Sequence, residues 1–202
     1  MQFHVVPDLL QLSFERAELS ELAGVPLLGV RQATITGTSA TVKRVFDILM
    51  VLPLLLLATV PLSLAWLRRD RSVPFLTREE RVGRNGTLFL QYSCQRSRRD
   101  PQQTRVTRLP QLVNVLRGEM SLVGPLAQNR AAVEQYQSWH LMRLKSTPGL
   151  TGLWAVHGRP DLTFDEMVRL DLFYAEHWSL WLDVKVLLRS FARLWRRSDG
   201  HG

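Results

Sequence analysis

The amino-acid sequence predicts an α+β fold that is mainly helical, with a re-entrant membrane helix, a short β-hairpin and amphipathic interfacial helices. Three patterns lead to this prediction. Residues 48–67 are apolar and uncharged, an Asn-Gly pair separates two β-like runs, and the last third of the chain has helical periodicity. A chain of 202 residues with 46% hydrophobic content is long enough to bury the core of one domain.

The first 42 residues predict a fragment of an α/β unit. His4–Leu9 (HVVPDL) is typical of a strand that ends at a turn, and Pro26–Val30 predicts a short buried strand. Such strands need neighbours to pair with, and this part of the chain supplies few. We therefore expect residues 1–42 to be separate from the rest.

The apolar run Ile48–Leu67 predicts a membrane helix. Its 20 residues carry no charge, and a helix of about 20 residues is about as long as a bilayer core is thick, roughly 30 Å. The alternative is a buried core helix. A core helix of that kind normally has a polar stripe, and this run has none, so the membrane helix is favoured.

The same run predicts a helix that enters the membrane and returns. Pro53 and Pro61 lie inside it, and each interior proline removes a hydrogen bond, so we expect a bend or a break. Positive charge flanks both ends, with Lys43 and Arg44 before the run and three arginines after it, at positions 68, 69 and 71. A single straight span favours positive charge on one side only.

The residues after the apolar run predict a β-hairpin. Val73–Thr77 and Thr87–Tyr92 are the β-like runs, and Gly83–Gly86 between them contains the Asn-Gly pair. A phosphate-binding role for the two glycines is the weaker interpretation, because their spacing matches neither a P-loop nor GxGxxG.

Polar, basic residues 93–108 predict a loop, and helices follow it. The pattern is helical over Leu109–Arg117, where Gly118 predicts the stop, and again over Ala131–Lys145, where Pro148-Gly149 follows.

Two further helices are predicted near the C-terminus. The first is Phe164–His177, with Thr163 as its N-cap. The second is Leu180–Arg197. It has one apolar stripe, and its other residues are largely basic. This pattern fits either an interfacial membrane helix or a helix packed on the core. The nearby apolar run Ile48–Leu67 favours the membrane interface. The stripe consists of Trp181, Val184, Leu188, Phe191 and Trp195, and the basic residues are Lys185, Arg189, Arg193, Arg196 and Arg197.

The charge of the chain points to an anionic partner. The net charge is +8, and residues 68–108 hold eleven arginines against four acidic residues. Guanidinium groups bind phosphate well and also lie against anionic lipid. Nucleic acid is disfavoured, because aromatic residues that could stack on bases, such as Phe89 and Tyr92, are few among these arginines.

Cysteine and histidine usage limits the chemistry. Cys94 is the only cysteine, so no internal disulfide can form, and the five histidines are scattered without ligand spacing. The residues by themselves thus predict no metal site.

Several motifs resemble those of the bacterial sugar transferases, the polyprenyl-phosphate phosphoglycosyl transferases of exopolysaccharide and O-antigen synthesis. The central one is Asn114–Pro125 (NVLRGEMSLVGP), preceded by Leu109–Leu112 (LPQL). Further matches occur in the family's order, at Lys43–Asp47, Glu80–Gly86, Pro148–Trp154, Gly158-Arg159, Asp161–Leu172 and Trp178–Leu188. The resemblance assigns 43–197 to the transferase domain, 198–202 to a tail, and 1–42 to the remnant of a preceding Rossmann-like domain.

The resemblance implies an activity and a location. Members of the family transfer a sugar-1-phosphate from a nucleotide sugar to undecaprenyl phosphate. They are monotopic proteins on the cytoplasmic face of the bacterial inner membrane, and each has a re-entrant helix. An aspartate of an Asp-Glu pair attacks the substrate phosphate, with Mg²⁺ offsetting the negative charge. The implied partners are membrane lipid, undecaprenyl phosphate and nucleotide sugar, and a homo-oligomer is left open.

This chain departs from the family where the Asp-Glu pair belongs. Thr107 and Arg108 stand directly before Leu109-Pro110, which resembles an internal deletion. Arginine is no nucleophile at neutral pH, and threonine would need a strong base. We therefore assign no catalytic residue, and the Mg²⁺ that the family implies lacks its ligand. Asp100 and Glu119 are poor substitutes for the pair.

Four residues on family motifs remain candidates for binding phosphate or nucleotide: Arg81, Arg117, Arg159 and Glu119. A structural ion pair is an equal alternative for Arg117. In the family's Arg-Pro position after Gly124-Pro125, this chain has Leu126-Ala127, so one phosphate-binding arginine is lost. The sequence leaves two functions open, a transferase with impaired activity and a non-catalytic membrane-associated pseudoenzyme or degraded fragment.

Overall fold

The computed structural model of the chain describes residues 19–22, 25–28, 35–69, 71–72, 74–95, 106–157 and 162–196. The chain divides into two compact units, Met1–Gln32 and Ala33–Gly202. In the smaller unit, β1 (Leu19–Leu22) pairs antiparallel with β2 (Val25–Leu28). The strand predicted at Pro26–Val30 overlaps β2, and the strand predicted at His4–Leu9 lies outside the described residues.

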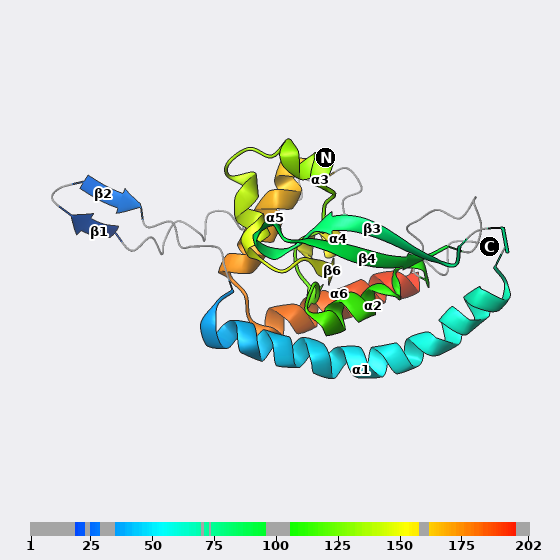
Figure 1. The fold of residues 1–202 in the computed structure, drawn as a ribbon. Helices are drawn as coiled ribbons and strands as arrows, with labels where there is room; N and C mark the ends of the chain where they lie inside the picture. The colour runs from blue at the N-terminus through cyan, green and yellow to red at the C-terminus, as the bar shows by residue number, and fades with distance from the viewer. Residues whose placement is uncertain are drawn as a thin grey trace, which may run out of the picture. The chain divides into compact units, whose positions relative to one another are not determined.

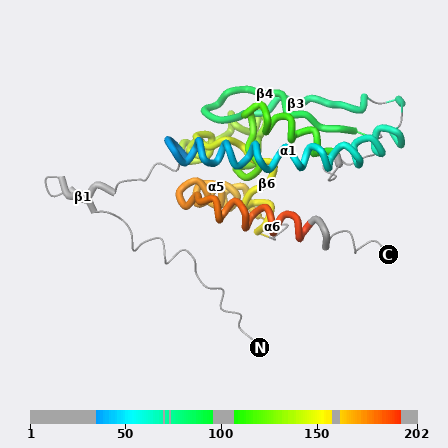
Figure 2. Tube along the Cα trace, turned by 90° about the horizontal axis from the view of Figure 1, so that it is seen from below, coloured from blue at the N-terminus to red at the C-terminus, as the bar shows by residue number. Residues whose placement is uncertain are grey.

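The larger unit is an α+β domain that is mainly helical, as predicted. Its elements in chain order are α1 (Gly37–Leu67), β3 (Leu76–Val82), η2 (Arg84–Gly86), β4 (Leu88–Cys94), η3 (Val106–Arg108), α2 (Gln111–Arg117), β5 (Ser121–Val123), α3 (Arg130–Glu134), η4 (His140–Lys145), β6 (Gly149–Thr151), α4 (Leu153–Val156), α5 (Phe164–Glu176) and α6 (Leu180–Arg196). Helix α1 runs along one edge of this unit, below α2 and the β3–β4 hairpin (Figure 1). Seen from below, α6 lies on one side of α1 and the hairpin on the other (Figure 2).

Helix α1 is continuous through both of its prolines and curves, so the structure shows the bend, and not the break, of the two outcomes expected (Figure 1). Pro53 and Pro61 lie inside a single helix of 31 residues, which curves around the rest of the unit (Figure 1). A proline removes one backbone hydrogen bond, and contacts of α1 with α2 and β5 support the helix along its length. The helix also begins at Gly37, six residues before the boundary expected at residue 43.

One face of α1 packs on the domain and the other is exposed. Among the residues in contact with the domain, Val51, Ala58 and Ala65 are buried. Twelve large exposed apolar side chains lie on the rest of its surface: Val42, Val45, Leu49, Met50, Leu52, Leu54, Leu56, Leu57, Val60, Leu64, Trp66 and Leu67. The helix is long and apolar enough to cross a membrane, and only 17% of its most apolar window is buried. A buried core helix is therefore excluded.

Strands β3 and β4 form the predicted hairpin, with Asn85 and Gly86 at positive φ in its turn. The first strand is shifted from the predicted Val73–Thr77 to Leu76–Val82. Because this strand contains several charged residues, the pattern of hydrophobic residues did not reveal it. They alternate in the strand, so that Glu79 and Arg81 are half-buried while Arg78 and Glu80 are exposed.

The single helix predicted over Ala131–Lys145 is wrong. The structure has a short α3 followed by the 3₁₀ helix η4, because the backbone N–H of Gln137 donates to Nδ1 of His140 instead of continuing the helix.

A buried ion pair joins η4 to α5. Arg143 in η4 lies 2.6 Å from a carboxylate oxygen of buried Asp171 in α5. Burial raises the pKa of Asp171 to about 7, although Arg143 opposes the shift.

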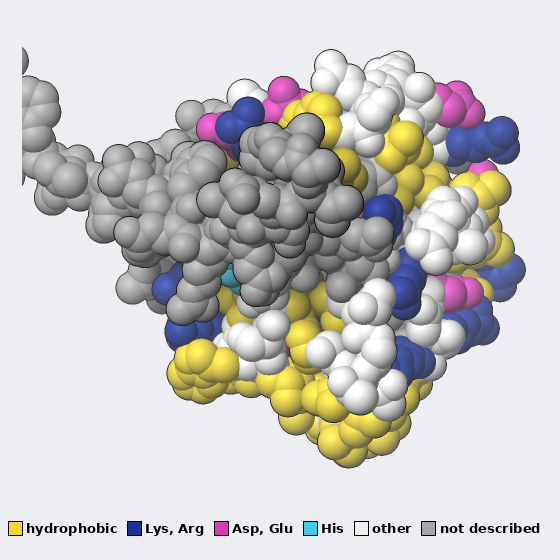
Figure 3. Space-filling view, turned by 90° about the vertical axis from the view of Figure 1, so that its left-hand side faces the viewer, with side chains coloured by type: hydrophobic (Ala, Val, Ile, Leu, Met, Phe, Trp, Pro, Cys, Tyr) yellow, Lys and Arg dark blue, Asp and Glu magenta, His cyan; other side chains and the backbone are white. Residues whose placement is uncertain are grey.

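The two C-terminal helices confirm the prediction. Thr163 and Glu166 form a capping box at the start of α5. In α6, Asp183 and Val186 are buried, whereas the predicted apolar stripe is exposed at Trp181, Leu188 and Phe191. A helix with its tryptophan stripe turned outward fits the interfacial interpretation. Hydrophobic side chains gather along the lower edge of the domain, where α1 runs (Figures 1 and 3).

Candidate functional site

A buried polar network ties the start of α1 to the domain. Nζ of Lys43 lies 2.8 Å from Oδ2 of Asp183 in α6. The other oxygen of Asp183 accepts from the hydroxyl of Tyr174 at 2.6 Å. Burial, and then the charge of Asp183, raise the pKa of Tyr174, which keeps its hydroxyl protonated as a donor. Asp47 accepts from the hydroxyl of Ser121 at 2.7 Å. The Lys43–Asp47 motif therefore positions α1 against β5, α5 and α6.

Gly118 and Arg44 together cap the C-terminal end of α2. Gly118 adopts φ 85° as the left-handed cap, a conformation that glycine adopts without strain. The guanidinium of Arg44 donates to the backbone oxygens of Val115 and Leu116, the latter at 2.7 Å. A cation at this position also interacts favourably with the helix dipole.

Asn114 joins α2 to the free edge of β4. Its side-chain oxygen accepts from the backbone N–H of Tyr92 at 3.0 Å, and its amide donates to the carbonyl of Leu90 at 2.7 Å. One side chain thus supplies the partners that another strand would give to this edge. The amide also donates to Oε2 of Glu119 at 2.6 Å.

These contacts define the roles of two predicted candidates. Glu119 supports Asn114, which is fully buried. Arg117 lies over the ring of Tyr92, 5.1 Å from its centre, and donates to its hydroxyl. Arg117 is therefore held by an aromatic side chain, and no ion pair involving it occurs among the described residues.

The position of the family's acidic pair lies just before the other end of α2. Thr107 is 1% exposed. Burial, and then the nearby charge of Arg81, lower the pKa of Arg108. Arg81 also lies 2.6 Å from Glu79, and its buried Nε has no hydrogen-bond partner among the described residues. The structure therefore brings predicted Arg81 close to Arg108, and sequence reasoning had not paired them.

The described residues around Thr107 do not fit a Mg²⁺ ion. Mg²⁺ needs oxygen ligands, usually including carboxylates. The carboxylate of Glu79 is paired with Arg81, and Arg108 adds a second cation beside it. No group of three His, Cys, Asp or Glu residues that could hold a metal occurs in the described parts of the chain.

Arg159 and Asp100 lie outside the described residues. At the family's Arg-Pro position, the backbone oxygen of Leu126 accepts from Arg143 and Ala127 is buried in the core. Pro53 and Pro61 lie within α1, as described above.

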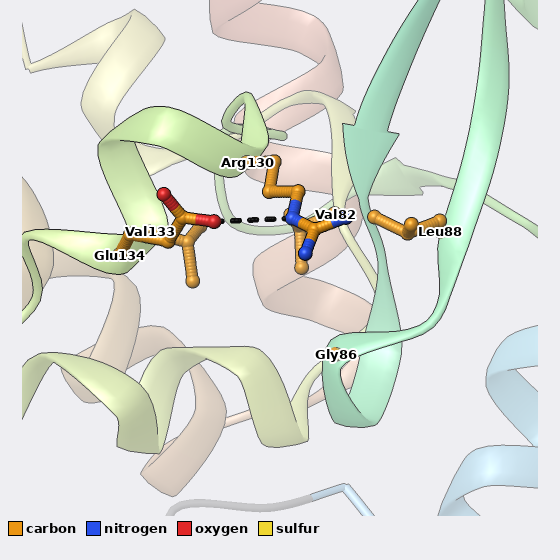
Figure 4. A pocket seen from close by; sticks show the side chains of 6 residues that line it. All are labelled: Val82, Gly86, Leu88, Arg130, Val133 and Glu134. Carbon is orange, nitrogen blue, oxygen red and sulfur yellow. Dashed lines mark hydrogen bonds and ion pairs between the residues drawn. The ribbon is translucent and has the colours of Figure 1, made fainter.

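Two cavities of different character lie in the larger unit. One of about 510 Å³ lies between the hairpin and α3, and its only two charged residues, Arg130 and Glu134, pair with each other at 3.1 Å (Figure 4). The other, of about 210 Å³, lies at the start of α1. It is lined by Ile35, Ala40, Lys43, Arg44, Asp47, Arg84, Gly118, Met120, Ser121, Lys145, Ser146 and Thr147.

Sequence reasoning did not single out the basic residues of this second cavity as a group. Lys43-Arg44, Arg84 and Lys145 are far apart in the sequence, and only the contact between η2 and η4 brings the last two together. The one signal in the sequence for this basic group was an arginine in the hairpin turn, Arg84.

Residues 38–197 match the bacterial sugar transferase family. The chain belongs to this family. It is 30% identical to undecaprenyl-phosphate galactose phosphotransferase of Salmonella typhimurium, with 97% of this chain and 49% of the relative covered. It is 34% identical to galactosyl transferase CpsE of Streptococcus agalactiae, over 72% of this chain and 40% of the relative. It is 28% identical to UDP-glucose:undecaprenyl-phosphate glucose-1-phosphate transferase of Escherichia coli, over 91% and 46%.

The lengths of these matches are informative. The chain spans about half the length of the curated relatives it matches. The match to the Salmonella transferase extends over 236 residues, more than the 202 of this chain. The relative therefore has residues within the matched region that this sugar transferase lacks.

Proposed function

We propose that this protein is a membrane-associated domain for transferring a sugar-1-phosphate from a nucleotide sugar to undecaprenyl phosphate, and that its transfer activity is impaired. The reaction and both substrates are those that the names of its relatives state. Such transfer initiates exopolysaccharide or lipopolysaccharide synthesis.

One observation supports the impairment. Thr107 and Arg108 occupy the place of the acidic pair, and Arg108 lies buried near a second arginine, Arg81. Neither side chain is a carboxylate nucleophile, and a site with two cations has no attraction for Mg²⁺. The longer matched region of the Salmonella relative agrees with an internal deletion before Leu109.

Two helices support a location at a membrane. The exposed face of α1 and the outward stripe of α6 both present large apolar side chains, which a lipid bilayer would cover. We place the domain on the cytoplasmic face of the bacterial inner membrane, with α1 inserted and the arginine-rich residues near anionic lipid.

A turnover assay tests the impairment. Membranes from cells that produce the full chain would be supplied with undecaprenyl phosphate, Mg²⁺ and UDP-glucose or UDP-galactose. Release of nucleoside monophosphate should stay far below that from membranes with the Salmonella relative. Release well above the mock level that depends on undecaprenyl phosphate would show that transfer is not impaired.

The second candidate function is that of a non-catalytic pseudoenzyme on the membrane. The absence of a metal-binding group among the described residues favours it. Measurable residual turnover that depends on undecaprenyl phosphate would exclude it in favour of the impaired transferase.

Membrane fractionation tests the shared part of both proposals. The full chain should sediment with membranes and remain there in high salt, because burial of apolar area holds it. Recovery as a soluble monomer would contradict membrane association.

A further inference from the structure

The basic cavity at the start of α1 has the size and position of a small binding site. Its volume is about 210 Å³, and a water molecule occupies about 30 Å³ in the liquid. The cavity is formed by the first turns of α1, the hairpin turn η2, the residues that follow α2, and the end of η4. It lies at the opposite end of α2 from Thr107 and Arg108, so it is separate from the place of the acidic pair.

Positive charge in this cavity exceeds negative charge. Asp47 is the only acidic residue of its lining, and its oxygens accept from Ser121 and from the backbone N–H of Leu122. Lys43 pairs with Asp183. Arg84 and Lys145 form no ion pair among the described residues, and Arg44 contacts only backbone oxygens.

A buried hydroxyl in the lining lacks a partner. Ser146 is 5% exposed, and its Oγ makes no hydrogen bond within the described parts of the chain. Leaving a buried hydroxyl without a hydrogen-bond partner costs free energy. Ser146 lines the cavity next to Lys145, so an acceptor bound there would restore its hydrogen bond.

We propose that this cavity binds a phosphate group. A phosphate offers several acceptor oxygens and negative charge, which match the three cations Arg44, Arg84 and Lys145 and the hydroxyl of Ser146. The apolar cavity beside α3 lacks this property, because its one arginine is neutralised by Glu134. The phosphate comes from the solution or from a lipid headgroup at the membrane that α1 contacts.

Binding of free phosphate is measured first. The full chain in non-ionic detergent would be titrated with inorganic phosphate by calorimetry at constant ionic strength. We expect one saturable site. The double variant R84Q/K145Q should bind at least about tenfold more weakly, since hydrogen bonds to charged groups contribute about 1.5–3 kcal/mol each. S146A should weaken binding about fivefold.

A matched control removes the same charge elsewhere. Arg130 and Arg169 are exposed and lie outside the cavity lining, so R130Q/R169Q should bind phosphate as the unmodified chain does. Circular dichroism of each variant checks that it is folded. Equal binding by R84Q/K145Q and the unmodified chain would overturn the proposal.

A second arm tests the lipid source. The thermal midpoint of the full chain would be compared in phosphatidylcholine nanodiscs with and without phosphatidic acid. A ligand that binds only the folded state raises the midpoint, and the increase should be lost in R84Q/K145Q and kept in R130Q/R169Q. Binding in this arm alone identifies a headgroup, and binding of inorganic phosphate identifies a free anion. Binding in neither arm overturns the proposal. No arm requires turnover, so the result is independent of the transferase proposal.

Discussion

The two ends of α2 differ in what surrounds them. At the C-terminal end, Arg44 and Gly118 complete the helix, and Asn114 and Glu119 join it to β4. Just before the N-terminal end, Arg108 lies near a residue of its own charge, Arg81, whose Nε has no partner among the described residues. Hydrogen bonds hold the C-terminal end of α2, whereas two arginines lie near each other before its N-terminal end.

This difference distinguishes two groups of residues in the sugar transferase domain. Residues of the central motif hold the fold together, and the residues before α2 stand at the place of the acidic pair that the resemblance implies. The central motif Asn114–Pro125 remains recognisable, and its side chains have structural roles that do not require turnover. Thr107 and Arg108, which the resemblance sets at the position of the acidic pair, lie just before the N-terminal end of α2. Variants at the two ends should therefore differ in their effects on stability.

Asn114→Leu should have the largest effect. It leaves the backbone N–H of Tyr92 and the carbonyl of Leu90 without their partner, and we expect the unfolding free energy to fall by on the order of 3 kcal/mol. Denaturant unfolding in detergent measures it. Val113→Ala, on the more exposed face of the same helix, is the control and should cost much less. Equal losses would contradict the edge-pairing role of Asn114.

Arg44→Met should have the next largest effect. The substitution keeps an apolar stem but removes two hydrogen bonds to the end of α2, with an expected loss of about 2 kcal/mol. The same denaturant experiment measures it. Arg69→Met, which removes a cation at the far end of α1, should change stability by less than about 0.5 kcal/mol. A loss for Arg44→Met that is no larger would show that the cap is unimportant.

Gly118→Ala should have a smaller effect. At φ 85° a side chain costs about 1 kcal/mol, and the added Cβ would meet Arg44 at an ordinary contact distance of 3.4 Å. The strain is therefore the only expected cost. Gly118→Asn, which tolerates this conformation better, should lose less stability than Gly118→Ala. The reverse order would count against a left-handed cap.

Arg108→Gln, before the other end of α2, should have the smallest effect. It removes repulsion from Arg81, so we expect a change within about 0.5 kcal/mol, or a slight gain. Added salt should stabilise the unmodified chain more than the variant, because screening weakens like-charge repulsion. A loss as large as that of Asn114→Leu would mean that both ends of α2 belong to the scaffold.

The sequence predicted those elements whose signals are local. The Asn-Gly turn, the stop at Gly118 and the cap at Thr163 are set by a few neighbouring residues, and the structure confirms them. Prediction was wrong where the pattern of apolar residues did not follow the backbone. The helix expected over Ala131–Lys145 is interrupted, and the first hairpin strand extends through charged residues.

The candidate site divides in the same way. The sequence identified Thr107-Arg108 at the place of the acidic pair, because that departure from the motif is visible in the residues themselves. It did not reveal that Arg108 and Arg81 are neighbours, or that Asn114 pairs with β4. Contacts between residues more than 20 positions apart depend on how the elements pack.

By itself, the sequence of this sugar transferase determined its family and its apolar helix, because composition and motif order carry that information. At the two prolines of α1 the sequence left a bend or a break open. The tertiary structure decided for the bend, since the helix curves without breaking and packs against α2 and β5. Tertiary structure also placed Arg44, Arg84, Lys145 and Ser146 around one cavity, since only the fold brings α1, η2 and η4 together.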